Sequence, residues 1–70
     1  MTLKEGYTPH QERVVSEQRD LSMKITGLDS FIDNNGIFIT LSETEQDLMK
    51  AQRAMMKAYS SILLARINLF

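Results

Sequence analysis

The sequence of 70 residues contains no cysteine, no tryptophan, one proline and one histidine. Without cysteine the chain cannot form a disulfide, and His10 alone does not make the ligand set of a zinc site. The core of so short a chain rarely contributes more than about 3–5 kcal/mol of stability. Because disulfides and metals are excluded, we expect association with other chains to supply further stability.

A large charge of one sign and long apolar runs are also missing. The formal net charge is −1, so the chain as a whole lacks the positive potential that DNA binding needs. No run approaches the roughly 18 apolar residues of a membrane span, and residues 1–9 lack the apolar stretch of a signal peptide. We therefore expect no membrane and no DNA partner, and a location in the cytosol.

The order of helix signals predicts a tail over residues 1–8 and a helical hairpin over residues 9–70, with helices over 9–34 and 43–69 joined by a link over 35–42. Thr8, Pro9 and Gln11 form a helix start with a capping box, and Ser42 with Glu45 forms a second. Asn34, Asn35 and Gly36 are expected to end the first helix, because asparagine and glycine tolerate the left-handed conformation of a C-cap.

Residues 37–41 are the one β-favouring run of the sequence, Ile-Phe-Ile-Thr-Leu. A single short strand has no partner within the chain. We expect an extended link whose Ile37, Phe38 and Leu41 plug the end of a helical bundle. Edge pairing of this run between subunits is the alternative.

The second helix carries more apolar surface than one neighbouring helix can cover. One set repeats at spacings of three and four: Leu48, Ala51, Met55, Ala58, Ile62, Ala65 and Leu69. A second set runs beside it: Met49, Met56, Tyr59, Leu63 and Phe70. A helix that is apolar nearly all round is buried by several neighbours. The predicted fold is therefore all-α, an antiparallel two-helix hairpin that assembles into a homo-oligomeric helical bundle.

The residues that could carry catalysis are few. One histidine, no cysteine and no glycine-rich phosphate loop argue against nucleophilic, redox and nucleotide-hydrolysing mechanisms. Asp29 and Asp33 lie one helical turn apart, an arrangement far more typical of a solvated face than of a catalytic or metal-binding pair. We expect no enzyme, no cofactor and no metal.

Two groups of residues are candidates for binding an anion. Lys50, Arg53 and Lys57 share one face of the second helix, where they either pair with Glu17, Asp20 or Asp29 of the first helix or bind a phosphate. At the open end, antiparallel packing brings the start of the first helix beside the end of the second. We predict a ligand-binding set from both groups: His10, Arg13, Tyr59, Arg66, Lys57 and Arg53. In the alternative interpretation, Tyr59 packs in the core, Arg13 pairs with Glu17 and His10 is solvated.

Four segments resemble a family of short phage proteins related to an uncharacterised protein of crAss-like phages. They read HQERVVSE, KITGLDSFI, LSETEQDLM and KAYSSILLARINLF, and the resemblance covers about residues 10–70. It implies a phage accessory protein in the cytoplasm of a bacterial host. No family site residues accompany it. Small oligomeric phage proteins of this type often counter host defence.

Three functions fit these features. The leading hypothesis is a non-enzymatic homo-oligomer that sequesters a nucleotide-derived immune signal in pockets between subunits. The second is an inhibitor or adaptor that grips a host defence protein through an apolar helix face, for which Met49, Met56 and Phe38 are candidates. The third is a structural bundle without a ligand.

Overall fold

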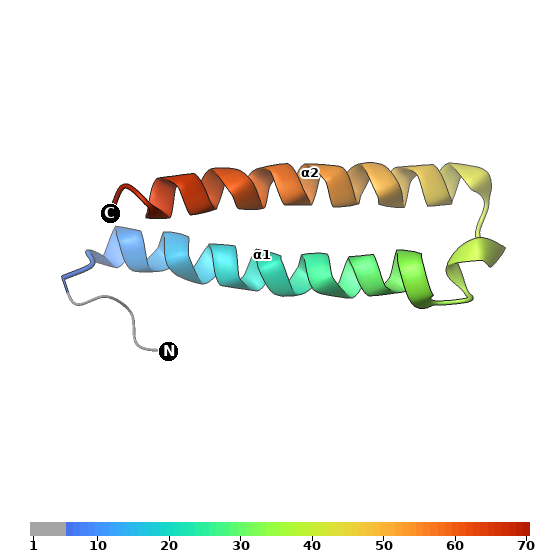
Figure 1. Ribbon diagram of the computed structural model, residues 1–70, viewed down its shortest axis with the longest axis horizontal. Coiled ribbons are helices and arrows are strands. Elements are labelled where there is room, and N and C mark those ends of the chain that lie inside the picture. The colour runs from blue at the N-terminus through green and yellow to red at the C-terminus, as the bar shows by residue number, and fades with distance from the viewer. Residues whose placement is uncertain (1–5) are drawn as a thin grey trace.

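The chain folds into two long antiparallel helices joined by a tight turn (Figure 1). A computed structural model describes residues 6–70; the first five residues of the predicted tail lie outside this range. Helix α1 spans Pro9–Asn34, the 3-10 helix η1 spans Phe38–Thr40, and helix α2 spans Glu43–Ile67, two residues short of its expected end. Over residues 6–70 there is no strand, which confirms the all-helical hairpin. Assembly of several copies stays a prediction.

Both helices begin at the side chains that the sequence indicates. The Thr8 hydroxyl accepts a hydrogen bond from the Gln11 backbone N–H at 3.2 Å, and the Gln11 side chain accepts one from the Thr8 N–H at 3.0 Å. The Ser42 hydroxyl likewise accepts from the Glu45 N–H at 3.1 Å, but the Glu45 side chain accepts no hydrogen bond in return, so the second predicted capping box is only half formed. These bonds satisfy backbone donors that have no partner inside a helix, so each start is determined locally.

The left-handed conformation that asparagine and glycine would tolerate at the end of α1 is not adopted there. Asn35 is extended, with φ −100° and ψ 121°, rather than left-handed. Its side-chain oxygen accepts a hydrogen bond from the Ile37 N–H at 2.8 Å, and its carbonyl accepts one from Phe38 at 3.1 Å. The asparagine side chain thus organises the turn itself, and a left-handed residue is not needed.

The link is also not extended. Residues 38–40 form η1, because a compact turn returns the chain over the short distance between two packed helices. Phe38 is buried and packs edge-to-face on Phe31, with ring centroids 6.2 Å apart. It therefore covers the turn end of the hairpin as expected, and Leu41 is half-buried. Ile37 is 58% exposed and does not.

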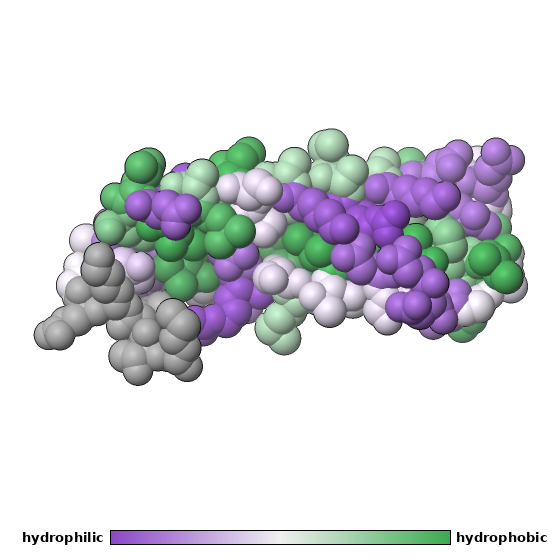
Figure 2. All heavy atoms as spheres, in the orientation of Figure 1, coloured by the Kyte–Doolittle hydropathy of each residue, from purple (hydrophilic) through white to green (hydrophobic). Residues whose placement is uncertain are grey.

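The core of the hairpin is thin. Three apolar side chains are buried among the described residues, Val14, Phe38 and Leu63, and Leu63 alone is completely so. The α2 face toward α1 contains these buried and half-buried residues: Met49, Arg53, Met56, Ser60, Leu63 and Ile67; Phe70, beyond the end of α2, is also half-buried. Much of the remaining apolar surface of α2 stays exposed, and Figure 2 shows it gathered over the C-terminal part of this helix.

Candidate functional site

Two grooves run along opposite sides of the hairpin. The first, here called the Tyr59 groove, is lined by Arg13, Ser16, Glu17, Asp20, Leu21, Lys24 and Tyr59. The second, here called the Met23 groove, is lined by Val15, Gln18, Arg19, Ser22, Met23, Thr26, Leu64 and Ile67. At about 100° per residue, the two sets of α1 residues project to either side of the face that packs on α2.

The Tyr59 groove combines an aromatic ring with charges of both signs, in a volume of about 370 Å³. The Tyr59 hydroxyl donates a hydrogen bond to the Glu17 carboxylate, which joins α2 to α1 across the groove. Tyr59 as a residue remains 43% exposed. Tyr59 is thus neither a core residue nor a freely moving surface side chain: its hydroxyl is bonded to Glu17, and the residue is partly exposed at the groove.

Four charged residues follow one another along the α1 wall of this groove. Arg13 and Lys24 lie at its ends, about 16 Å apart at 1.5 Å per residue, with Glu17 and Asp20 between them. Over residues 6–70, every ion pair involves Arg53 or Lys57, so the cations of the groove are not neutralised by a salt bridge. The wall therefore offers positive donors at two ends and carboxylate acceptors in the middle.

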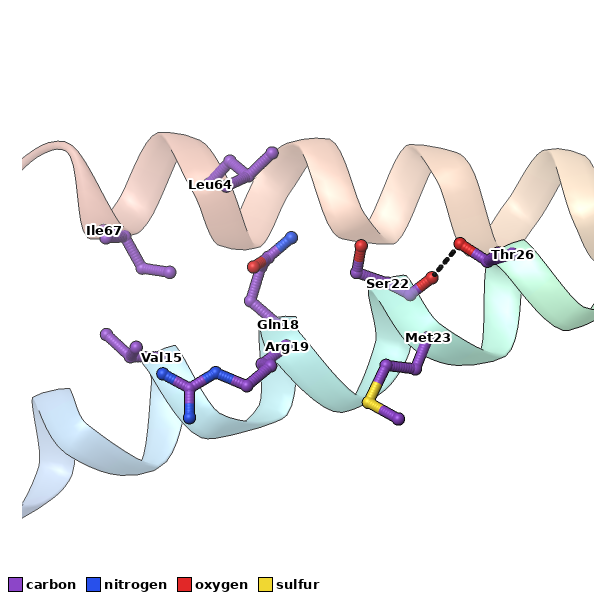
Figure 3. A pocket seen from close by; sticks show the side chains of 8 residues that line it. All are labelled: Val15, Gln18, Arg19, Ser22, Met23, Thr26, Leu64 and Ile67. Carbon is purple, nitrogen blue, oxygen red and sulfur yellow. Dashed lines mark hydrogen bonds between the residues drawn. The ribbon is translucent and has the colours of Figure 1, made fainter. Parts of the chain in front are cut away.

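The Met23 groove has a different chemistry, shown in Figure 3. Two of its four polar side chains already donate hydrogen bonds: Thr26 to the Ser22 carbonyl at 3.1 Å, and Gln18 to the Ser60 hydroxyl at 3.3 Å. Arg19 is the single charged residue of the lining, beside the apolar side chains of Val15 and Met23. This groove suits an apolar group better than a polar ligand.

Arg53 and Lys57 lie in a cluster of ion pairs, apart from both grooves. Arg53 Nη1 is 3.1 Å from Asp33 Oδ1 and 3.4 Å from Asp29 Oδ1, and Lys57 Nζ is 3.3 Å from Asp29 Oδ1. Of the two alternatives for these cations, the structure has the pairing with α1. Lys50 instead lies over the Phe38 ring, with Nζ 5.9 Å from its centroid.

The predicted ligand-binding set is therefore divided. Arg13 and Tyr59 line the same groove. His10 and Arg66 are exposed and line neither groove. At the open end, Tyr7 packs edge-to-face on Phe70, with centroids 5.8 Å apart.

Sequence reasoning missed Lys24 and the role of the carboxylates Glu17 and Asp20. A signal for them exists: positions 13, 17, 20 and 24 recur at spacings of three and four, which places them on one face of α1. Only the pairing of the helices shows that Tyr59 of α2 lies opposite this face.

Residues 6–70 contain neither a cluster of metal-binding side chains nor a membrane-spanning helix. No group of three or more histidine, aspartate or glutamate side chains in the described part of the chain is arranged to hold a metal ion. Neither long helix of residues 6–70 is apolar enough over sufficient length to cross a bilayer.

Comparison with known proteins gives two matches. A family model described as Sequestin matches residues 8–69. A protein of Enterobacteria phage T4, described as an uncharacterized 7.5 kDa protein in the denB-rIIB intergenic region, is 38% identical over 61 residues, which is 87% of this chain and 94% of the relative. No solved structure matches. The phage relative supports the predicted kinship with small phage proteins, whereas nothing in these matches links the chain to crAss-like phages.

Proposed function

The chain belongs to the Sequestin family, and from this premise we propose that it counters host defence by binding and sequestering a nucleotide-derived immune signal. The family name is compatible with a sequestering protein. Sequestration requires binding without turnover, so no catalytic group is needed and the proposed protein is not an enzyme. It would act in the cytoplasm of the host cell, where such signals are produced.

The observation that carries this proposal is the composition of the Tyr59 groove. A nucleotide has phosphates, ribose hydroxyls and a flat base, and each of these needs a different partner. Arg13 and Lys24 supply charge-assisted donors for phosphate, and arginine can bind it in a two-pronged geometry. Because neither cation is held in a salt bridge with a described residue, binding breaks no ion pair.

The other residues of the groove fit the uncharged parts of a nucleotide. Carboxylates accept hydrogen bonds from ribose hydroxyls, and Glu17 and Asp20 lie between the two cations. The ring of the partly exposed Tyr59 offers a stacking surface for a base, and its hydrogen bond to Glu17 restricts its motion. Of the predicted ligand-binding residues, Arg13 and Tyr59 are thus the proposed contacts, whereas Arg53 and Lys57 act within the ion-pair cluster.

The test is binding of cyclic di-AMP and of the linear dinucleotide pApA, measured by isothermal titration calorimetry and native mass spectrometry. Loss of a hydrogen bond to a charged group costs about 1.5–3 kcal/mol, so Arg13→Ala is expected to weaken binding by about 10- to 100-fold. Arg19→Ala is the matched control, since Arg19 is an exposed arginine of the same helix that lines the Met23 groove. Equal affinity of the Arg13→Ala and unsubstituted chains would refute the site.

The alternative function, inhibition of a host protein, would depend on apolar residues other than the three expected from the sequence. Met49 and Met56 are half-buried against α1 and Phe38 is buried, so these residues do not form a free face. Exposed apolar residues do lie elsewhere on α2, Leu48 and Met55 among them. A stoichiometric host protein retained on the purified chain, with no bound nucleotide, would favour this function. A chain that binds neither would favour the structural bundle.

A further inference from the structure

Helix α2 carries an apolar seam that the hairpin leaves uncovered. The seam consists of Leu48, Ala51, Met55, Ala58, Ile62, Ala65 and Leu69, all of which are exposed. Its large members are 65%, 68%, 58% and 86% exposed in chain order. At about 100° per residue, the seam lies roughly 150° around α2 from the residues that pack on α1. Helix α1 therefore cannot cover it.

The spacing of the seam is that of a coiled coil. Its large residues recur every seven positions, its alanines recur every seven positions, and the two series alternate at three and four. This is the a and d pattern of a helix that packs along its length against another helix. The seam contains no polar residue, whereas the α1-facing side of α2 includes Arg53 and Ser60.

We propose that the seam pairs antiparallel with the seam of a second copy of this chain. In this antiparallel register, two residues that face each other have numbers whose sum is 113. Leu48 therefore faces the partner's Ala65, Ala51 faces the partner's Ile62, and Met55 faces the partner's Ala58. Each of these layers then holds one large side chain and one alanine, whereas Leu69 at either end faces the partner's Thr44. This uniform layer volume allows the two helices to approach closely along their whole contact.

Parallel pairing lacks this match. In a parallel dimer, Leu48 would face the partner's Leu48, and in the next layer Ala51 would face the partner's Ala51. Layers would therefore alternate between two large side chains and two methyl groups, which leaves voids beside crowded layers. The antiparallel arrangement also sets the two helix dipoles in opposite directions.

The charges beside the seam agree with the antiparallel register. Glu45 and Arg66 occupy equivalent flanking positions, and antiparallel pairing places Glu45 next to the partner's Arg66. The twofold axis repeats this pair at the other end. In a parallel dimer Arg66 would flank the partner's Ser61, without charge complementarity. A second copy thus fits the seam in both volume and charge.

The proposed dimer also completes the candidate site. Tyr59 flanks the seam on the side of the Tyr59 groove, near the twofold axis between positions 56 and 57. The partner's α2 then forms a further wall of this groove, with the partner's Gln52 beside Tyr59. This last step rests on the proposed function, whereas the pairing of the helices does not.

The first test is the mass of the ligand-free chain by analytical ultracentrifugation. A dimer has twice the 8.0 kDa of one chain. Ala58→Glu places a charge in the seam and is expected to give a monomer. Ala54→Glu is the matched control, since Ala54 is exposed in the same helix but lies beside the seam, and it should remain a dimer. Circular dichroism checks that both variants stay helical.

The second test uses the absence of native cysteine to determine the orientation. Leu48→Cys and Ala65→Cys are prepared separately and oxidised alone or as an equal mixture. In the antiparallel register two copies of position 48 lie about 25 Å apart along the helices, so neither variant should cross-link by itself. The mixture should give a disulfide-linked dimer.

Each outcome of these tests is decisive for the pairing. Cross-linking of either single variant alone would indicate a parallel or shifted register and overturn the proposal. A monomeric unsubstituted chain, or no cross-link in the mixture, would overturn it as well. Because no nucleotide is present, these results stand apart from the binding test of Arg13→Ala.

Discussion

Substitution of Leu63 by alanine tests how the hairpin is held together. Leu63 is the one described side chain that is completely buried, between α2 and α1. The removed groups carry about 0.8 kcal/mol of transfer free energy per methylene, and a residual cavity raises the usual total to about 2–5 kcal/mol. A slender two-helix structure can relax around the cavity, so we expect the lower half of this range. The core of so short a chain supplies a free energy of unfolding of only about 3–5 kcal/mol. Leu63→Ala should therefore remove most of the stability.

The measurement is the free energy of unfolding in urea, followed by helical circular dichroism at one protein concentration. Leu64→Ala is the control, because it makes the same chemical change one residue later at a side chain that is 46% exposed. It should cost less than about 1 kcal/mol. If Leu63→Ala is unfolded in water, trimethylamine N-oxide restores the folded state for comparison. Equal losses in the two variants would refute the assignment of the α2 face that packs on α1.

Two further substitutions test the polar and backbone features of the hairpin. Arg53→Met removes both ion pairs of a guanidinium whose side chain is only 24% exposed, and it should lower the free energy of unfolding by up to about 1 kcal/mol and reduce its dependence on salt. Unchanged salt dependence in urea titrations would argue against the Asp29 and Asp33 pairs. Gly27→Ala should raise stability by up to about 1 kcal/mol, or about 4–8 °C in Tm, because a Cβ at this mid-helix position meets no atom within 4 Å. A lower Tm in a thermal scan would indicate instead that a second chain approaches closely at Gly27.

The features that follow from the sequence alone are local. The starts of both helices are set by Thr8 and Ser42, whose side chains bond to backbone three residues away. Helix α2 then continues without glycine or proline, and α1 has a single interior glycine, Gly27. The short turn between the two helices favours an antiparallel hairpin. The turn itself was harder to predict, because the β-favouring residues 37–41 are overridden by the burial of Phe38 on Phe31.

The candidate site was partly accessible to the same reasoning. In the antiparallel pair, Arg13 and Tyr59 line one groove, whereas His10 and Arg66, which the sequence grouped with them, line neither groove. The sequence cannot predict that Arg53 and Lys57 find Asp29, since helical spacing alone allows these cations either to pair or to remain free. Whether they pair depends on which carboxylates of α1 lie level with Arg53 and Lys57 along the hairpin. That is fixed only when the two helices pack together.

Only the tertiary structure decided which apolar stripe of α2 faces α1. The sequence contains two such stripes, and helix periodicity describes both equally well. The stripe that contains Leu63 also contains Arg53 and Ser60. Across the interface, Arg53 donates a hydrogen bond to Asp29, and Ser60 accepts one from Gln18. The wholly apolar seam has no such partners and stays exposed. Burial and hydrogen bonding between residues distant in the chain make this choice, and no local pattern in the sequence contains that information.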